Sequence, residues 1–493
     1  MLKAMGKKLL FFLLIPVIGI SQVQIGQDIV GAGSKDHCGY SVALSSYGNV
    51  VAVGAPLNNG NGVDSGHVRI YEEIFGDWTQ IGQTLEGEFS GDQNGFSVAL
   101  SSFGNIVAIG SPFNDGNGTN SGTVRVYEFD MGVWKQKGHD IDGKSAGDQN
   151  GFSVSLSSNG NIVAIGAPYK PWQGDPHNPA GTVRVYSYSN VSGVWTQIGQ
   201  DIDGQGFMYY SGTSISLSSD GSILAIGTIY ELGTGVVRVY RNISGVWTQI
   251  GNTVQGEGVP DRFGRSVSLS SDGSVLAVGG YLNDYKGLNA GHVRVYKNVS
   301  GNWVQIGDDI DGEAAHDNSG FSVSLSADGN IVAIGAFLSS SNGDRSGTVR
   351  VYENISGDWT KIFDDIDGKK NGEYIGYNVS LSADGNRVAI GAPQFPVVAI
   401  GEGLARVYEL QKSTNNIFVK NNFHLYPNPA SDILNIRLES NFTLEKVTVY
   451  NNLGQMIKTT KETVVNVENL SPGIYFVEVL TDQGKGTKKV IIK

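Results

Sequence analysis

The sequence predicts an all-β protein: a seven-bladed β-propeller followed by a small C-terminal β-sandwich. Three observations support this prediction. A stretch of the form "GFSVSLSSNGNIVAIGAP" occurs seven times, at spacings of 52 to 61 residues, within a chain of 493 residues. The 69 glycines fit a protein of short strands and tight turns, and the composition changes after residue 410. A fixed period with several short strands per unit is typical of propeller blades.

Residues 1–21 are expected to form a secretory signal peptide. Three lysines precede an apolar run, Leu9 to Ile20, and a small-x-small cleavage site follows. The run is shorter than the ~20 residues that a membrane helix needs, and we expect no membrane span.

Each repeat is expected to supply four antiparallel strands. In the third copy, Val154 and Leu156 alternate with serines, which is the period of a strand beside a narrow axis. The following Asn-Gly or Asp-Gly pair predicts a two-residue hairpin turn. The seventh copy lacks an outer strand, while "VQIGQDI" (residues 23–29) matches "TQIGQDI" (residues 196–202). The N-terminal residues are therefore expected to complete the last blade and cover its open edge.

Two sets of charged residues recur in the repeats, which favours structural roles. An arginine stands two residues before a tyrosine in every copy, so both side chains share one strand face. Three residues before each repeat glycine, six copies carry a carboxylate and the fourth carries Tyr209; the carboxylates are Asp36, Asp92, Asp148, Asp261, Asp317 and Glu373. We expect them to cap turns or pair with the arginines; the alternative is an acidic ring that holds a cation.

The predicted ligand-binding residues lie where the sevenfold pattern breaks. The third copy contains the insertion "YKPWQGDPHNPA", and the next link reads "GQGFMYYSG". Both loops are expected at the same end of the propeller. The predicted residues are Tyr169, Trp172, Phe207, Tyr209 and Tyr210. Exposed rings of this kind stack on sugars or anchor a protein partner, although they could instead pack the two loops together.

Signals of catalysis are sparse. The sequence has no G-x-S-x-G elbow and no H-x-x-x-H spacing, and His67 and His292 replace the threonine of the "GTVRVY" strand. We expect no catalytic residues, no metal site and no cofactor. The formal net charge of −12 makes nucleic acid an unsuitable partner, and cations or neutral glycans fit this charge better.

The stretches "FGRSVSLSSDGSVLAVGG" and "NGFSVALSSFGNIVAIGSP" resemble the FG-GAP repeats of integrin alpha propellers and of many secreted bacterial proteins. The resemblance covers all seven copies and implies a propeller over residues 22–410. Propellers with these repeats serve in adhesion, in ligand binding and as scaffolds. Because the first hairpin lacks the D-x-[DN]-x-[DN]-G pattern, integrin-style calcium is not implied.

After a polar linker at residues 411–422, residues 423–493 read as alternating strands. The segments "YPNPASDILNIRL", "VTVYNNLGQMI", "LSPGIYFVEV" and "KKVIIK" strongly resemble the type A sorting domain of the type IX secretion system. The resemblance implies that this domain engages the type IX secretion machinery of a Gram-negative cell and is removed after export.

We therefore expect a secreted or cell-surface binding or adhesion protein whose propeller recognises an extracellular glycan or protein. The alternatives are an extracellular enzyme acting on polysaccharide and a structural surface protein without a specific ligand. An enzyme should gather carboxylates or histidines at the axial mouth, whereas a binder should show an exposed aromatic or polar patch at the rim.

Overall fold

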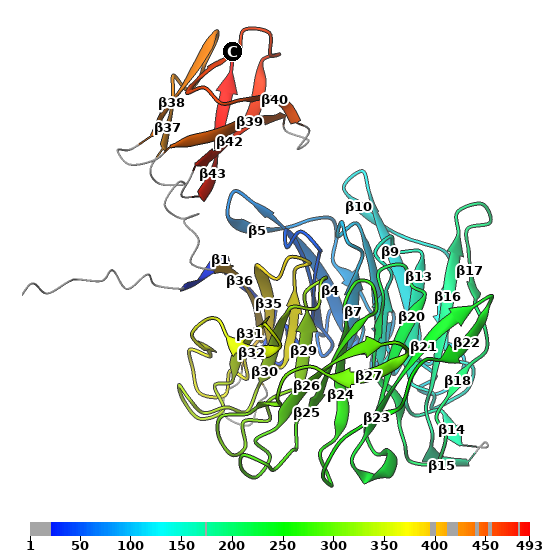
Figure 1. The fold of residues 1–493 in the computed structure, drawn as a ribbon. Coiled ribbons are helices and arrows are strands. Elements are labelled where there is room, and N and C mark those ends of the chain that lie inside the picture. The colour runs from blue at the N-terminus through cyan, green and yellow to red at the C-terminus, as the bar shows by residue number, and fades with distance from the viewer. Residues whose placement is uncertain are drawn as a thin grey trace, which may run out of the picture. The chain divides into compact units, whose positions relative to one another are not determined.

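The computed structural model describes residues 21–172, 175–394, 401–411, 423–438, 443–451, 456–481 and 484–493. The described chain is all-β, with a single short 3₁₀ helix (Figure 1). Residues 22–410 form one compact unit, and residues 411–493 belong to another. Nearly all of the predicted signal peptide and linker lies outside the described residues.

The larger unit contains seven antiparallel sheets of four or five strands in its described residues. The first sheet contains β2 (Ser41–Leu44), β3 (Val50–Ala55), β4 (His67–Ile74), β5 (Asp77–Gln80) and β6 (Leu85–Glu86). The second contains β7 (Ser97–Leu100), β8 (Ile106–Ser111), β9 (Thr123–Asp130), β10 (Val133–Gln136) and β11 (Ile141–Asp142). The third contains β12 (Ser153–Leu156), β13 (Ile162–Ala167), β16 (Thr182–Ser189), β17 (Val194–Gln197) and β18 (Ile202–Asp203). Its insertion forms a separate pair, β14 (Pro171–Trp172) and β15 (Asp175–Pro179).

The fourth sheet contains β19 (Ser211–Leu217), β20 (Ile223–Thr228), β21 (Val236–Ile243), β22 (Val246–Gln249) and β23 (Val254–Gln255), with the 3₁₀ helix η1 (Glu231–Gly233) between β20 and β21. The fifth contains β24 (Phe263–Leu269), β25 (Val275–Gly280), β26 (His292–Val299), β27 (Asn302–Gln305) and β28 (Ile310–Asp311). The sixth contains β29 (Ser322–Leu325), β30 (Ile331–Ala336), β31 (Thr348–Ile355), β32 (Asp358–Lys361) and β33 (Ile366–Asp367). The seventh contains β34 (Asn378–Leu381), β35 (Arg387–Ala392), β36 (Leu404–Gln411) and β1 (Ser21–Val30).

The N-terminal strand completes the last sheet, as predicted. β1 pairs with β36, so the edge that the seventh repeat leaves open is covered by a strand from the other end of the unit. The carboxylate of Asp28 accepts two hydrogen bonds from the buried guanidinium of Arg406, each at 2.9 Å.

Side chains join each sheet to the next near the axis. The Ser97 hydroxyl donates to the carbonyl of Gly151 at 2.8 Å, and five other repeats make the same bond. In the seventh sheet Asn378 replaces the serine, and its Oδ1 accepts the Val42 N–H of the first sheet at 3.1 Å. The repeating sheets and these joints fit a propeller-like arrangement.

The predicted two-residue hairpin turn is wrong. In the third sheet the Ser157 N–H donates to the Ile162 carbonyl at 2.9 Å, which leaves a four-residue turn. Within it only Gly160 has a positive φ, at 68°, and the side-chain oxygen of Asn159 accepts the Asn161 N–H at 3.0 Å. The Asn or Asp before the glycine therefore serves as a side-chain cap, not as a second left-handed residue.

The C-terminal unit consists of two antiparallel sheets. One contains β37 (Phe423–Tyr426), β38 (Ile433–Leu438) and β41 (Val464–Asn466). The other contains β40 (Met456–Thr460), β39 (Leu444–Asn451), β42 (Gly473–Thr481) and β43 (Gly484–Ile492). Residues from both sheets, among them Phe423, Leu434 and Val477, share one buried core, which is the packing of a β-sandwich.

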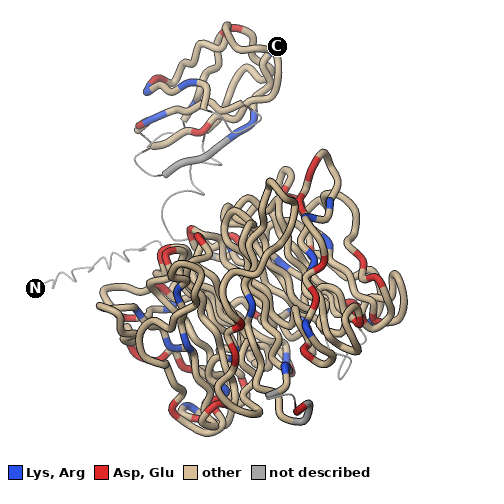
Figure 2. The backbone as a smooth tube through the Cα atoms, turned by 90° about the vertical axis from the view of Figure 1, so that its right-hand side faces the viewer, with Lys and Arg blue, Asp and Glu red and all other residues tan. Residues whose placement is uncertain are grey.

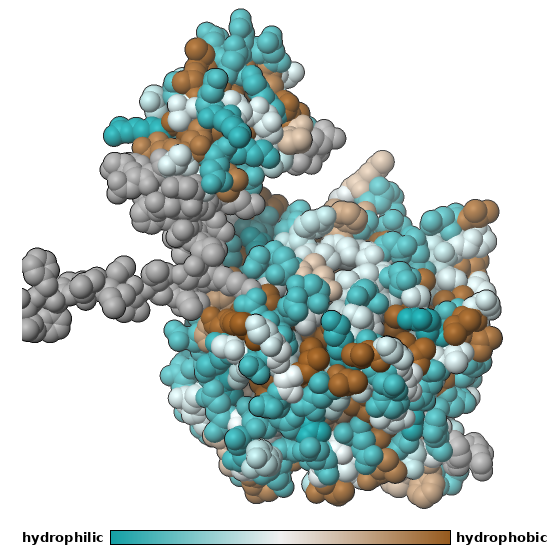
Figure 3. Space-filling model, in the orientation of Figure 1, coloured by the Kyte–Doolittle hydropathy of each residue, from teal (hydrophilic) through white to brown (hydrophobic). Residues whose placement is uncertain are grey.

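The surface mixes polar and apolar groups. Figure 2 shows acidic and basic residues interspersed along the larger unit, and Figure 3 shows a largely hydrophilic face broken by small hydrophobic patches. Among the described residues, no helix has the length and apolar character required to cross a bilayer.

Candidate functional site

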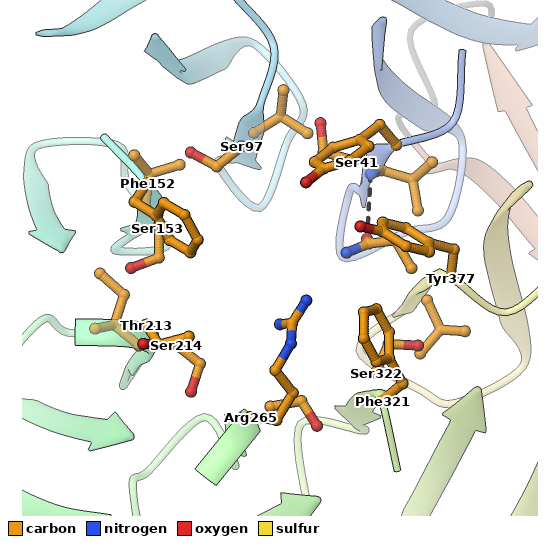
Figure 4. A pocket seen from close by; sticks show the side chains of 18 of the residues that line it. Ser41, Ser97, Phe152, Ser153, Thr213, Ser214, Arg265, Phe321, Ser322 and Tyr377 are labelled. Atoms are coloured by element: carbon orange, nitrogen blue, oxygen red, sulfur yellow. Dashed lines mark hydrogen bonds between the residues drawn. The ribbon is translucent and has the colours of Figure 1, made fainter. Parts of the chain in front are cut away.

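The inner strands of all seven sheets converge on one pocket of about 210 Å³. Figure 4 looks into this pocket, with the serines of the inner strands around it and the Arg265 side chain extending toward its middle. We call it the axial pocket. Its serine hydroxyls are already engaged in the bonds between sheets, so the residues that precede them decide what the pocket can bind.

Those residues follow the repeat glycines, and we call them the axial collar. They are Tyr40, Phe96, Phe152, Thr213, Arg265, Phe321 and Tyr377. Their placement depends on the glycine before each of them. Gly151, for example, has a φ of 89°, and a Cβ there would lie 2.6 Å from the carbonyl oxygen of Thr123. A residue with a side chain would have a strained backbone at this φ, and its Cβ would clash with that carbonyl. Glycine therefore allows the turn after which the next residue faces the axial pocket.

The five aromatic rings of the collar form a contiguous arc. The ring centroids of Tyr40 and Phe96 lie 4.9 Å apart, and the same distance separates Phe96 from Phe152. On the other side, Tyr377 lies 5.0 Å from both Tyr40 and Phe321. All five rings are half-buried, so part of each remains open to the pocket. The collar therefore offers aromatic faces to a ligand.

Arg265 interrupts the aromatic pattern with a positive charge. Its guanidinium lies 4.1 Å from the Phe321 ring centroid, a cation–π contact. Within the part of the chain that the structure describes, no carboxylate lies within ion-pairing distance of it. The strand arginines differ, because Arg294 and Arg350 each pair with carboxylates. The axial pocket thus contains a cation without a neutralising partner, which favours an anionic ligand.

The two collar tyrosines remain neutral at physiological pH. Burial raises the pKa of Tyr40 well above its ordinary value, and burial likewise raises the pKa of Tyr377. A neutral phenol both donates and accepts hydrogen bonds. The pocket therefore combines one cation with neutral polar groups on aromatic walls.

Two of the sequence-predicted residues extend this arc. The Tyr169 ring lies 6.0 Å from Phe152 and 5.2 Å from Tyr210, and Tyr210 lies 5.2 Å from Tyr230. The guanidinium of Arg262 covers Tyr230 at 3.6 Å. Tyr169, Tyr210 and Tyr230 thus continue the line of aromatic rings beside Thr213, the collar position that has no ring. Tyr169 is 39% exposed, so it packs against its neighbours and still faces solvent.

The other three predicted residues do not join the arc within the described residues. Phe207 is 62% exposed. Tyr209 is half-buried, and its ring covers Gly206. Trp172 lies in β14, and its side chain is outside the described residues. The ligand-binding role of all five residues stays a prediction, and the structure brings together only Tyr169 and Tyr210.

The axial collar was not among the predicted site residues, although the repeat contains a signal for it. The position after each repeat glycine is Phe or Tyr in five copies, and the exceptions, Thr213 and Arg265, stand in adjacent copies. A sevenfold alignment of the chain with itself exposes both exceptions. What the alignment does not show is that this position faces the axis.

The recurring carboxylates cap turns, as expected. Asp36 Oδ2 accepts the N–H groups of Ala32 and Gly33, and Asp261 does the same in its own turn. Glu373 caps its turn and also pairs with Arg406 at 2.6 Å. In the fourth sheet, where Tyr209 replaces the carboxylate, Glu231 of η1 pairs with Arg238 at 2.7 Å. The charge lost at Tyr209 is thus restored by another residue.

Comparison with known proteins identifies the C-terminal unit. Residues 424–493 match the family model described as the secretion system C-terminal sorting domain. This agrees with the predicted sorting domain, and the protein is secreted or located at the outer-membrane surface. The matched region does not include the repeats, so their FG-GAP resemblance stays a prediction.

Two solved structures are similar to the chain at low identity. A protein described as a 6-phosphogluconolactonase from Bacteroides uniformis is 13% identical, over 67% of this chain and 85% of that chain, with a TM-score of 0.47. A second so described, from Bacteroides fragilis, is 14% identical over 67% of this chain and 84% of that chain, with a TM-score of 0.46. Similarity this distant carries no information about activity. No curated protein matches the chain.

Proposed function

We propose that residues 22–410 form a closed, seven-bladed propeller that acts as an extracellular binding module for an anionic glycan. The observation that carries this proposal is Arg265, an unneutralised guanidinium in the axial pocket. The closed ring is supported by bonds between the first and seventh sheets, in which the N–H groups of Val42 and Leu44 donate to Asn378 and Ser380.

The negative charge of the whole chain favours neutral glycans, but the described lining of the axial pocket carries only the positive charge of Arg265 and suits an acidic sugar. Aromatic faces stack on the apolar faces of sugar rings, and a guanidinium binds a carboxylate or sulfate through paired hydrogen bonds. The volume of about 210 Å³ is below the roughly 300–1,000 Å³ of pockets for larger ligands. The pocket therefore favours a single charged sugar at the end of a glycan, with the Tyr169–Tyr210 extension available to the next residue.

Recognition fits this pocket better than catalysis. Its described lining consists of aromatic, hydroxyl, amide, aliphatic and guanidinium side chains, without a carboxylate, histidine or cysteine. A hydrolytic site needs a general acid, a base or a nucleophile within reach of the substrate. The described lining of the axial pocket has hydroxyls but no carboxylate, imidazole or thiol to activate them, which supports the binding module over the enzyme.

A glycan array tests the proposal. Full-length protein lacking only the signal segment is screened against oligogalacturonates, sulfated oligosaccharides and neutral oligosaccharides of matched length. We expect binding to the acidic series, with Arg265→Ala weakening it by about 1.5–3 kcal/mol, the scale of a hydrogen bond to a charged group. Arg241→Ala removes an exposed strand arginine outside the pocket and serves as the control. Equal binding of acidic and neutral sugars, or an unaffected Arg265→Ala protein, would refute the proposal.

A further inference from the structure

A second cluster of functional groups lies in the fifth sheet and shares no residue with the axial pocket. His292 is the first residue of β26, and it pairs in register with Asp311 of β28. One ligand atom each from His292, Asp309 and Asp311 lies within 4.8 Å of the other two. An imidazole and two carboxylates together form the donor set of a divalent metal site.

His292 is buried, and its one close polar contact among the described residues is with the carboxylate of Asp309, which is near enough for an ion pair but poorly aligned for a hydrogen bond. Its side chain has no exposed surface, and neither ring nitrogen has a hydrogen-bond partner within the described residues. Its Nδ1 lies 3.4 Å from Oδ2 of Asp309, and the buried Oδ1 of Asp311 is also without a partner. Leaving a buried polar group unsatisfied costs about 1–3 kcal/mol, so several such atoms at one place call for a ligand.

The fifth sheet makes room for this histidine. In the sixth sheet, the equivalent residue is Thr348, which lies opposite Ala336 and donates its hydroxyl to Asp367. In the fifth, His292 lies opposite Gly280, where a Cβ would come within 2.8 Å of the imidazole Nε2. Glycine at 280 thus leaves space for the imidazole ring, where the second, third and sixth sheets have a threonine.

The first sheet contains an incomplete copy of the cluster. His67 is buried opposite Glu86, with Nδ1 and Oε2 3.9 Å apart. The position that corresponds to Asp309 is Thr84, so the second carboxylate is missing. The first sheet therefore provides a histidine in the same setting without the full donor set, which makes it an internal control.

A cleft of about 570 Å³ gives access to the carboxylates from outside. Asp309 and Asp311 line it together with Lys286 and Glu313. Arg294 and Gln305 already donate to the Asp309 carboxylate, which leaves Oδ2 capacity for one further bond. The Nζ of Lys286 lies 3.8 Å from Oδ2 of Asp311, which is a weak ion pair. A cation that binds the carboxylate more strongly would displace it.

We propose that His292 Nδ1, Asp309 and Asp311 bind one divalent metal ion of the zinc class, with the remaining position open to the cleft. The nitrogen donor favours zinc, cobalt, nickel or copper over calcium and magnesium, which prefer oxygen ligands alone. Tetrahedral zinc holds its ligand atoms about 3.3 Å apart, close to the existing Nδ1 to Oδ2 separation of 3.4 Å. The site revises the expectation of no metal, which rested on ligand spacings along the chain.

Cobalt titration tests the site. Untagged full-length protein is stripped with a chelator and titrated with Co²⁺, whose visible absorption reports tetrahedral coordination, and Zn²⁺ is then added as competitor. We expect one Co²⁺ per chain, displaced by Zn²⁺. His292→Thr gives the fifth sheet the threonine that the sixth sheet has at Thr348. Loss of a residue that only hydrogen-bonds to a metal ligand weakens metal binding about 10–100-fold, and loss of the ligand His292 itself should weaken Co²⁺ binding by more.

Two further variants keep the result interpretable. His67→Thr should leave the stoichiometry and affinity unchanged. Asp311→Asn keeps the shape of the side chain and should weaken binding as His292→Thr does, so it decides the matter if the histidine variant does not fold. The proposal is overturned if wild-type protein binds no Co²⁺, or if either cluster variant binds it with unchanged affinity. Binding of Ca²⁺ in preference to Zn²⁺ would also overturn it.

Discussion

Every repeat contributes one outer strand and one collar residue, but the amino acid is constant in six outer strands and varies in the axial collar. Six outer strands carry a tryptophan whose indole N–H donates to a carbonyl of the preceding sheet, at 2.6–3.2 Å: Trp78, Trp134, Trp195, Trp247, Trp303 and Trp359. The collar position, by contrast, is aromatic in five sheets, Thr213 in the fourth and Arg265 in the fifth.

The difference follows from what each residue touches. A tryptophan that fills the space between two sheets and bonds to the neighbour is needed at every junction, so the repeat preserves it. A collar side chain faces the axial pocket, where changing one residue alters the ligand chemistry and leaves the junctions intact. The repeated positions therefore hold the larger unit together, and the exceptions are where we propose that it recognises a ligand.

The largest effect is expected from breaking a junction. Trp195 is 4% exposed, and its truncation removes both packing and an inter-sheet hydrogen bond. Trp195→Ala should lower the free energy of unfolding by about 3–5 kcal/mol. Urea denaturation measures this loss. Phe89→Ala, which truncates a ring that is 67% exposed, should change it little; equal losses for both would erase the proposed distinction.

A smaller effect, on binding instead of stability, is expected at the extension of the collar. Tyr169→Ala and Tyr210→Ala should each weaken binding of the acidic oligosaccharide by about 1–3 kcal/mol, as aromatic anchors do. Titration calorimetry gives the values. Phe207→Ala is the matched control, since that ring is exposed outside the arc. If Phe207→Ala weakened binding most, the site would lie on the outer loop and not along the collar.

Lowering the pH should reduce the free energy of unfolding of the sheets, while Arg265 in the axial pocket keeps its charge. Despite the opposing effect of burial, hydrogen bonds and nearby cations lower the pKa of Asp201 and of Asp365 below the ordinary value of 3.8. A lowered folded-state pKa adds stability above the unfolded pKa, and that stability is lost as the pH falls below about 4. Urea unfolding from pH 7 to pH 3 should show this decline, reduced in Asp201→Asn; a flat profile would contradict it.

Regular repetition made much of the fold predictable. The period predicted the succession of sheets, and the match between the two ends of the unit predicted that β1 completes the seventh sheet. The recurring carboxylates were correctly expected in turns, because a residue needed once per repeat belongs to the repeat. The turn length was missed, since Asn-Gly also suits a four-residue turn in which the asparagine side chain caps the backbone.

The sites were harder to predict because they depend on contacts across the chain. Arg265 is distinctive because no carboxylate among the described residues pairs with it. The sequence alone does not show which groups lie near a side chain. Glu231 compensates for Tyr209 from a separate 3₁₀ turn. His292 reaches Asp309 and Asp311 through strand pairing, at separations that match no metal-binding motif. The aromatic insertion was found because it interrupts the repeat visibly, whereas single substitutions within a repeat are easily read as tolerated variation.

We propose that ligand recognition resides in the exceptions to the repeat. The most direct test fills both exceptions with the usual residue, in the double variant Thr213→Phe and Arg265→Phe, and measures acidic oligosaccharide binding together with urea unfolding. We expect the variant to stay folded, with a free energy of unfolding lower by no more than about 3 kcal/mol, the usual limit for a small-to-large change, and binding at least about tenfold weaker, equivalent to 1.4 kcal/mol. A variant that binds the acidic oligosaccharide as tightly as the original protein would contradict the claim.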